Sequence, residues 1–336
     1  MLLLDRAEFP RDKTCAGGLS PRTCRVLQDL GLWGDVTREA YPIRAARLVS
    51  PGGREAFLTS RAHGAVLSRR RFDQLLADAA VREGVAFQPG RKVDELVEDE
   101  GHVVGVRCGS DEVAARHVIV ASGGNSRLVR DPRPLRRIHT CMAWYENVRV
   151  TPNAIEIIYD RELLPYYGWV FPESQGRANV GVAAPAGREG SRTVRDLFAS
   201  FLQRRLAGRL AGARPGGPWK GLLLSTCADV RHHAPPGALV VGEANRLVNS
   251  ASGEGILYAM LSGRLAAEAI RRGGERGLDA HGVGRLYERA LRGSCRWTFA
   301  RADFYCKLAA RGLDPLVAVG SLPPVARLLG RLFLRL

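Results

Sequence analysis

The pattern of hydrophobic and polar positions divides the chain into alternating strands and helices with a β-rich middle. Short apolar runs indicate buried strands, strict alternation indicates strands with one polar face, and apolar positions three and four residues apart indicate helices. The expected strands lie at 1–5, 91–98, 102–108, 118–121 and 238–241, the β-rich stretches at 42–66 and 134–224, and the helices at 21–30, 71–83, 191–206, 253–272 and 278–336. Strand–loop–helix units interrupted by a β-rich insert predict an α/β nucleotide-binding domain that carries a substrate domain.

The composition narrows the class of protein. The 336 residues, 46% of them hydrophobic, suffice for two domains or one large domain with a sizeable core, and they exclude disorder as the dominant state. No apolar run approaches the roughly 18–20 residues that span a bilayer, and the first residues lack the features of a signal peptide. Seven cysteines without a CxxC pair suggest neither a disulfide framework nor a metal site, so we expect reduced thiols in the cytoplasm.

The net charge of +16 invites a nucleic-acid or membrane partner. Only four of the basic residues are lysines, and the arginines are scattered along the chain. Nucleic-acid-binding proteins usually concentrate such charge on one face with interleaved aromatic residues. We therefore expect no nucleic-acid partner and attribute the arginines to codon bias, while an anionic lipid or diphosphate remains compatible with the charge.

Two segments near the amino terminus carry candidate chemistry. Asp5 ends the first strand, where an acid in dinucleotide-binding folds accepts hydrogen bonds from the adenosine ribose, although strands often end in Asp without a ligand. The loop that follows contains Cys15 and the pair Gly17-Gly18, which would let backbone approach a ligand closely. A solvent loop is the alternative, and a lone cysteine is more often a small buried hydrophobe than a reactive group.

Two further patterns lie later in the chain. Gly242-Glu243 ends a buried strand, and the turn Gly253-Glu254-Gly255 opens a long helix whose free N–H groups would stabilise negative charge on a ring carbonyl, such as that of a reduced flavin. A simple strand–loop–helix crossover is the alternative. Tyr167, Trp169 and Phe171 alternate, so they share one face of a strand. That face lines either an apolar substrate tunnel or the core of the insert.

Four segments match a known family in the same order along the chain: PRDKTCAGGLSPR, SRRRFDQLL, YGWVFPESQGRANVGV and VVGEANRLVNSASGEGILYAMLSGRLAAE. They resemble the geranylgeranyl reductase family of FAD-dependent oxidoreductases, within the para-hydroxybenzoate-hydroxylase-like flavoproteins. The resemblance covers residues 1 to about 272, and its most specific part is YxWxFPxxxGxxNVG.

The resemblance implies a Rossmann-like FAD-binding domain, a β-rich substrate domain and a C-terminal helical region. The FAD-binding domain would comprise residues 1–41, 67–133 and 225–272. The substrate domain would comprise residues 42–66 and 134–224, and the helical region residues 273–336. It also implies reduction of the double bonds of an isoprenoid or other apolar small molecule, by hydride transfer from the N5 atom of reduced FAD. NAD(P)H or another reductant would supply the electrons.

Residue roles follow from the same resemblance, position by position. For the cofactor, Asp5 would hold the adenosine ribose, Arg71 would lie beside the flavin chain, and Gly242-Glu243 would face the ribityl or pyrophosphate portion. Gly253, Glu254 and Gly255 would lie at the pyrimidine edge. The candidate catalytic residues that would approach the isoalloxazine ring or the substrate are Cys15, Tyr167 and Trp169.

The chain departs from the family in two respects, its amino-terminal start and several polar positions. Family members begin with a strand and a GxGxxG turn that cradles the pyrophosphate, and the FAD-binding domain of this chain is therefore expected to be N-terminally truncated. Glu243 replaces the usual Asp, with Arg246 near the usual glycine, and Ser122 replaces a common Asp. Two alternatives follow: a flavin monooxygenase of the same superfamily, which the aromatic strand disfavours, or a degenerate protein that has lost FAD binding.

The carboxyl-terminal segment 325–336 is apolar with spaced arginines. Such a helix would lie in the headgroup plane of a membrane, which would make the protein peripheral on its inner face. A helix packed on the insert domain is the equally weighted alternative.

Overall fold

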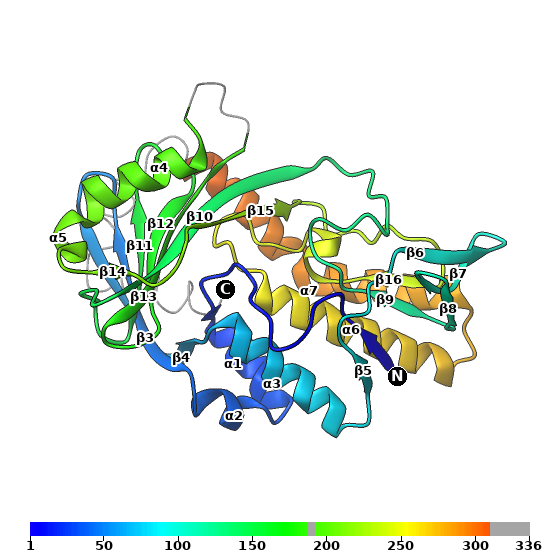
Figure 1. The fold of residues 1–336 in the computed structure, drawn as a ribbon. Helices are drawn as coiled ribbons and strands as arrows, with labels where there is room; N and C mark the ends of the chain where they lie inside the picture. Colours follow the sequence, from blue (N-terminus) through cyan, green and yellow to red (C-terminus); the bar gives the residue numbers. More distant parts are fainter. Residues whose placement is uncertain (187–191, 310–336) are drawn as a thin grey trace. The chain divides into compact units, whose positions relative to one another are not determined.

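The chain forms two compact units in a computed structural model that describes residues 1–186 and 192–309 (Figure 1). Unit 1 comprises residues 1–11, 76–136 and 225–303. Unit 2 comprises residues 12–75, 137–224 and the chain from residue 304 onward. Helix α3 (Arg69–Arg82) crosses from one unit to the other.

Unit 1 contains short parallel strand pairs and two long helices. Its elements are β1 (Leu2–Leu4), β5 (Ala86–Gln88), β6 (Glu95–Asp99), β7 (His102–Cys108), β8 (Asp111–Ala114), β9 (Val118–Val120), β16 (Ala238–Val240), a 3-10 turn η2 (Gly242–Asn245), α6 (Ile256–Glu275) and most of α7 (Ala280–Ala309). Strand β1 pairs with β5 and β9 pairs with β16, both in parallel, while β6, β7 and β8 form an antiparallel meander. The parallel sheet is thus divided into two pairs.

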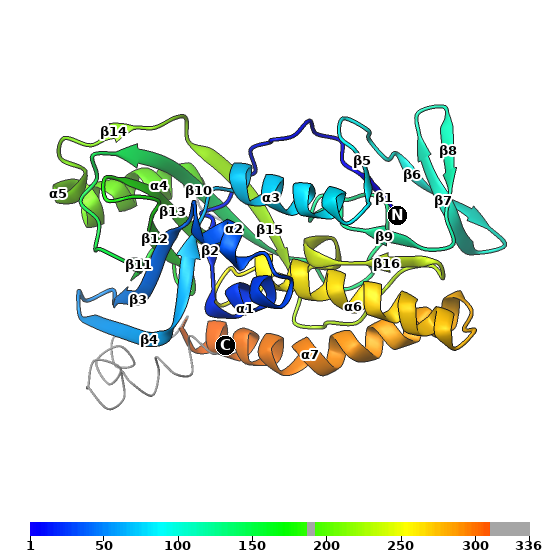
Figure 2. The same cartoon turned by 90° about the horizontal axis from the view of Figure 1, so that it is seen from below.

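Helices α6 and α7 run side by side (Figure 2). The buried ring of Tyr258 on α6 packs edge-on against Phe299 of α7, with the ring centroids 4.8 Å apart. From α7, the buried Tyr287 hydroxyl donates to the carbonyl oxygen of Val240 at 2.8 Å. Because Val240 lies in β16, this bond ties the helix pair to the parallel strands.

Unit 2 is built on a nine-stranded sheet in the described part of the chain. Its elements are β2 (Gly18–Leu19), α1 (Pro21–Asp29), α2 (Trp33–Thr37), β3 (Tyr41–Val49), β4 (Glu55–Val66), β10 (Arg136–Glu146), β11 (Ala154–Tyr159), β12 (Tyr167–Pro172), β13 (Arg177–Pro185), α4 (Val194–Phe201), a π-helical turn η1 (Leu202–Leu206), α5 (Ala207–Leu210), β14 (Arg214–Pro215) and β15 (Lys220–Thr226). The strand order is β14-β10-β13-β12-β11-β3-β4-β2, and β15 also pairs with β10. Among these strands β11 and β3 are parallel.

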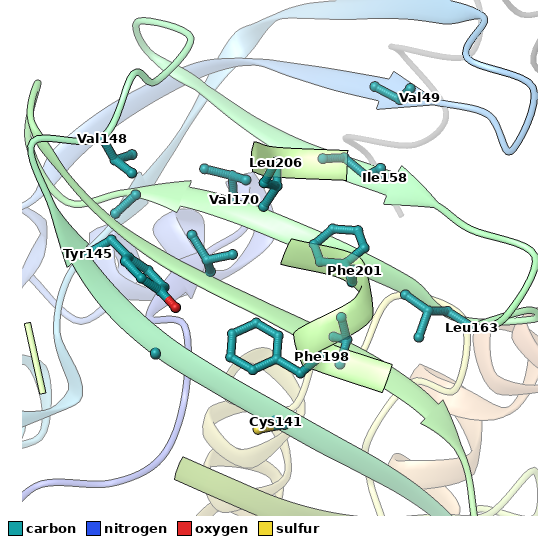
Figure 3. Close-up of a cluster of buried hydrophobic side chains, with 14 of the residues drawn as sticks. Val49, Cys141, Tyr145, Val148, Ile158, Leu163, Val170, Phe198, Phe201 and Leu206 are labelled. Atoms are coloured by element: carbon teal, nitrogen blue, oxygen red, sulfur yellow. The ribbon is translucent and has the colours of Figure 1, made fainter. Parts of the chain in front are cut away.

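The core of unit 2 lies where α4 covers one face of this sheet (Figure 3). Phe198 and Phe201 of α4 are fully buried against Val170 of β12 and its neighbours. A Cβ on Gly168 would lie 2.2 Å from the Phe201 ring, so only glycine lets the ring approach the strand. The helix starts with a capping box in which Thr193 and Asp196 satisfy each other's backbone N–H groups.

The structure confirms the expected α/β architecture and several local elements. Ser20 caps α1 by accepting the N–H of Thr23 at 3.3 Å, and residues 42–66 form the antiparallel β3–β4 pair around the expected turn. The helix expected at 253–272 begins three residues later, at Ile256. The division into units differs from the three domains expected from the sequence, because residues 12–41 fall in unit 2. Segment 325–336 lies outside the described residues.

Candidate functional site

The turn before α6 presents an uncapped helix N-terminus in unit 1. Asn249 organises the turn, because its Oδ1 accepts the N–H groups of Ala251 and Ser252 at 3.0 and 3.1 Å. Gly253 is exposed and has a φ of +66°, in the left-handed region that favours glycine. Gly255 at the N-cap supplies no side chain, and the first turn of α6 contains no acid. The helix dipole therefore favours a negatively charged ligand group at this end.

The Gly242-Glu243 segment follows β16 and is tied to its surroundings. Gly242 has a φ of +59°, and its N–H donates to the Ser262 hydroxyl of α6 at 2.9 Å. The Oε1 atom of Glu243 accepts the N–H of Ser225 at 3.1 Å, and a Cβ on Gly124 would lie 2.6 Å from it. The carboxylate thus lies at the carboxyl ends of β16 and β9, the edge where open α/β sheets bind ligands.

Asp5 lies directly after β1, where the sequence analysis expects it. Its Oδ1 accepts the N–H of Ala7 at 2.9 Å, and its Oδ2 faces the Arg11 guanidinium at 3.4 Å. The Asp5 side chain is 27% exposed, so it remains accessible to a ligand hydroxyl.

A buried polar network that the sequence analysis missed holds the loop after β16. Arg133 is 6% exposed, and its guanidinium donates to Asp131 at 2.6 Å and to the Asn245 side chain at 2.7 Å. Burial alone would raise the pKa of Asp131, but the Arg133 hydrogen bonds and charge lower it overall. Arg246 has a φ of +58°, in the left-handed region that favours glycine, and its guanidinium donates to the carbonyl oxygen of Asp131 at 3.1 Å. No local pattern connects residues so far apart in the sequence.

In unit 2, Cys15 lies against Arg69 of α3. The guanidinium of Arg69 bonds both carboxylate oxygens of Asp73, at 2.6 and 2.7 Å. Burial alone would lower the pKa of Arg69, but the neighbouring Cys15 and Asp73 raise it overall. The Sγ of Cys15 also accepts the N–H of Gly17 at 3.4 Å. The thiol therefore lies in positively charged surroundings.

Arg71, the expected cofactor residue of the same helix, pairs with Glu39. Its guanidinium makes two hydrogen bonds of 2.7 Å to the Glu39 carboxylate, and its side chain is 48% exposed. Of the run Arg69-Arg70-Arg71, the first residue is the one that contacts Cys15. The three arginines are adjacent in the sequence and differ only in the direction in which each projects from the helix axis. Neither composition nor motif reveals that direction.

Tyr167 and Trp169 share one face of β12, as expected, and both side chains are 8% exposed. The indole N–H of Trp169 donates to Asn179 Oδ1 at 2.8 Å. A Cβ on Gly181 would lie 2.2 Å from the indole, so the small residue makes room for the ring. The aromatic face is defined by Tyr167, Trp169 and the partly buried Phe171 that packs with them.

A pair of tyrosines, the buried Tyr159 and the partly buried Tyr305, joins the aromatic face and was not anticipated. The hydroxyl groups of Tyr159 and Tyr305 lie 3.0 Å apart, and the Tyr159 ring packs edge-on against Tyr167. Burial raises the pKa of both tyrosines, so both stay protonated. The two residues are 146 positions apart, and no signal in the sequence links them.

The candidate residues are thus distributed over both units. Asp5, Gly242, Glu243 and the turn 253–255 lie in unit 1. Cys15, Arg71, Tyr167 and Trp169 lie in unit 2. Their roles toward a cofactor or a substrate remain predictions.

Comparison with known proteins identifies similar sequences and folds. Residues 25–269 match the family described as FAD-dependent oxidoreductases. The chain is 35% identical to digeranylgeranylglycerophospholipid reductase 1 of Methanopyrus kandleri over 285 residues, which cover 80% of this chain and 73% of the relative. It is 31% identical to a menaquinone reductase of Mycolicibacterium smegmatis over 296 residues, covering 82% and 71% of the two chains.

Two solved structures share the fold. A geranylgeranyl bacteriochlorophyll reductase-like protein from Thermoplasma acidophilum superposes with a TM-score of 0.83 at 23% identity, covering 96% of this chain and 85% of the other. The flavin-dependent brominase Bmp2 gives 0.82 at 21% identity, covering 98% and 86%. Both likenesses concern the architecture, and they confirm the expected fold class.

Proposed function

Because the chain belongs to the family of FAD-dependent oxidoreductases, we propose that it reduces carbon–carbon double bonds in the isoprenoid chain of a lipid. Family membership confirms three predictions: the protein is an enzyme, its reaction is an oxidation–reduction, and its cofactor is FAD. The substrate class and the residue roles belong to the proposal.

The residues of unit 1 fit FAD. The α6 N-terminus has no side-chain cap and no acid in its first turn, so its backbone donors and dipole suit the electron-rich pyrimidine edge of a reduced flavin. Neither Gly253, which is exposed, nor Gly255 at the N-cap places a side chain over this end of the helix. Asp5 would hold the ribose hydroxyls, and Glu243 would face the ribityl or pyrophosphate portion.

The single observation that carries the substrate class is the 35% identity to a digeranylgeranylglycerophospholipid reductase. Digeranylgeranyl glycerophospholipids and menaquinones are both lipids with isoprenoid chains, so the two relatives share an apolar, unsaturated substrate feature. The aromatic face supports this class, because aromatic side chains bind a hydrocarbon chain without needing polar partners. Polar groups at this face are few: the indole N–H of Trp169, which is already bonded to Asn179, and the hydroxyl groups of the tyrosine pair.

Reduction of an alkene needs a hydride on one carbon and a proton on the other. When bound and reduced, FAD supplies the hydride. Tyr159 and Tyr305 keep their protons because burial raises the pKa of each, so either hydroxyl holds a proton beside the aromatic face. Trp169 and Tyr167 would position the substrate chain and exclude water. Cys15, in the positive surroundings of Arg69, is the remaining candidate for contact with the ring or the substrate.

The proposal is tested with the purified full chain supplied with FAD and a digeranylgeranyl phospholipid under anaerobic conditions. NAD(P)H and dithionite serve as alternative reductants. We expect visible flavin absorption and a product heavier by two hydrogens per reduced bond, measured by mass spectrometry. A colourless protein that refuses FAD would favour a degenerate protein, and a hydroxylated product formed only with oxygen would favour a monooxygenase.

A matched set of variants tests the role of the aromatic face. Tyr159→Phe keeps the ring and removes only the hydroxyl, while Trp169→Phe replaces the indole with a smaller ring and removes the donor to Asn179 Oδ1. We expect Tyr159→Phe to lower the reduction rate and leave flavin absorption unchanged. Phe57→Tyr, on the exposed surface of β4, is the control and should match the wild type. Equal rates in all variants would remove the tyrosine pair from the mechanism.

We also propose that the protein acts at a membrane surface, where such a lipid resides. No helix among the described residues is both long and apolar enough to cross a bilayer. The excess of 16 positive charges attracts anionic lipid, and the segment 325–336 combines arginines with apolar residues. Deleting residues 322–336 should reduce co-sedimentation with anionic liposomes, and unchanged binding would contradict this role of the segment.

A further inference from the structure

Unit 2 contains a pocket of about 270 Å³ that none of the candidate residues above lines. Four arginines contribute to its wall, together with one acid and three apolar side chains. The lining residues are Arg47, Val49, Gly53, Glu55, Ile158, Arg204, Arg205, Leu206 and Arg209. They come from β3, the β3–β4 turn, β4, β11, the π-helical turn and α5.

The π-helical turn η1 (Leu202–Leu206) brings three of these arginines together. A π-helical turn inserts an extra residue into a helix, which shifts the faces on which the following side chains lie, and such turns are frequent at functional sites. Here Arg204 and Arg205 within the turn and Arg209 in α5 line the same pocket. Arg205 also anchors the turn to the β3–β4 connection, by donating to the carbonyl oxygens of Ser50 and Pro51 at 3.0 and 3.2 Å.

Three of the four guanidinium groups are balanced by carboxylates. Arg47 and Arg209 share the buried Glu156, which is 1% exposed, and Arg47 also pairs with Glu55. Arg204 pairs with Asp160 at 3.0 Å and with Glu162 at 2.6 Å.

Arg205 differs from the other three. Within residues 1–186 and 192–309 its guanidinium donates to the two carbonyl oxygens of Ser50 and Pro51, which carry no formal charge. The one acid that lines the pocket, Glu55, is 41% exposed at its side chain, so water screens it in part. Arg192 also pairs with Glu162, at 2.9 Å, so five guanidinium groups in and beside the pocket face four carboxylates (Glu55, Glu156, Asp160 and Glu162), and one positive charge is left over.

Three apolar side chains also line the pocket, and Val49, Ile158 and Leu206 are 7%, 4% and 2% exposed. Guanidinium groups next to apolar side chains suit an anion that is joined to carbon. Guanidinium groups bind phosphate oxygens through paired, charge-assisted hydrogen bonds. We propose that this pocket binds the phosphate group of a phosphate ester, supplied by a lipid headgroup or by a free small molecule.

This inference does not depend on the proposed reaction. The pocket is formed wholly by unit 2, and its residues differ from those expected to hold FAD. If the protein does not reduce isoprenoids, the proposed phosphate site is unaffected. If the pocket does not bind phosphate, the proposed reaction is unaffected.

The test uses the full-length protein loaded with FAD and three phosphate sources at constant ionic strength: inorganic phosphate, glycerol 1-phosphate, and vesicles that contain phosphatidylglycerol. Calorimetry measures binding of the two soluble anions, and co-sedimentation measures binding to the vesicles. Arg205→Gln removes the unbalanced charge and should weaken binding about tenfold, the cost of one charge-assisted hydrogen bond. Glu55→Gln removes the competing acid and should strengthen binding.

Arg25→Gln, on the exposed surface of α1, lowers the net charge equally and should bind as the wild type does. Opposite effects of Arg205→Gln and Glu55→Gln cannot come from a general loss of folding, which would weaken binding in both. Binding of glycerol 1-phosphate with this pattern would support a free phosphate ester, and the same pattern with vesicles alone would support a lipid headgroup. Equal binding by all four proteins, or binding by none, would overturn the proposal.

Discussion

The strands of units 1 and 2 are arranged and buried in different ways. In unit 2, nine strands hydrogen-bond to their neighbours in one sheet. The core residues Ala178, Val180 and Val182 of this sheet are fully buried. In unit 1, the parallel strands form two separate pairs, and β1 exposes Leu2 and Leu3 at 38% and 37%. Parallel strands are normally buried on both faces, so the hydrophobic positions of β1 contribute less to stability than their sequence suggests.

This difference shows that the same kind of apolar run has a different energetic value in the two units. Residues 2–4 and 180–182 both read as strands. The second segment lies between β10 and β12 in a sheet covered by α4, whereas the first has one partner strand among the described residues. The stability of unit 1 therefore depends more on α6, α7 and the buried polar groups around β16.

Truncation of Phe201 should give the largest effect. Phe201→Ala removes a fully buried ring from the core of unit 2, and we expect a loss of about 3–5 kcal/mol in the free energy of unfolding. Urea unfolding followed by circular dichroism measures it. Leu3→Ala in unit 1 is the matched comparison and should cost about 1 kcal/mol or less, because the side chain is already partly exposed. Equal losses would remove the distinction between the units.

Acidification should destabilise unit 1 through His232. Its Nε2 accepts the N–H of Val240 at 3.2 Å, and burial, with the charges of His233 and Arg133, lowers the pKa of His232 to about 4. The unfolded chain takes up this proton near pH 6.5, so the stabilisation is complete above that pH. It is lost as the pH falls toward 4, by at most about 3 kcal/mol.

The measurement is the free energy of unfolding between pH 4 and 7 for the wild type and His232→Gln, which keeps a side-chain acceptor. The variant should show a flatter dependence on pH over this range. Identical slopes would mean that other groups in the chain account for the acid sensitivity.

Loosening the turn before α6 should have a moderate effect on cofactor binding. Asn249→Ala removes two hydrogen bonds to backbone N–H groups, each with a net value of about 1 kcal/mol, and we expect FAD to bind about tenfold more weakly. Flavin fluorescence during titration measures the affinity. Ser110→Ala, in the exposed β7–β8 turn of the same unit, should leave it unchanged. Unaltered affinity in Asn249→Ala would argue against the turn as the flavin site.

The smallest effect is expected from a charge on β1. Leu3→Lys should change the free energy of unfolding by less than about 0.5 kcal/mol, because its side chain is partly exposed and a long lysine reaches water. The same substitution at Val180 should prevent unit 2 from folding, since that side chain is fully buried. Loss of folding in Leu3→Lys would show that β1 is buried in the working protein.

Local features of the fold were predictable from the sequence because neighbouring residues determine them. Ser20-Pro21 starts a helix through its own side chain and ring, and Pro51-Gly52-Gly53 turns the chain between two alternating segments. The shared face of Tyr167 and Trp169 follows from the two-residue repeat of a strand. The family and the cofactor were predictable for a related reason, since they rest on short segments whose residues are adjacent in the chain.

Only the tertiary structure decided which distant residues meet. It placed Arg69 beside Cys15, Tyr159 beside Tyr305, and Arg133 beside Asn245. It also gathered arginines from β3 and from the π-helical turn around one pocket. Contacts of this kind depend on helix phase, strand register and the packing of the whole unit, and periodicity along the chain carries none of that information.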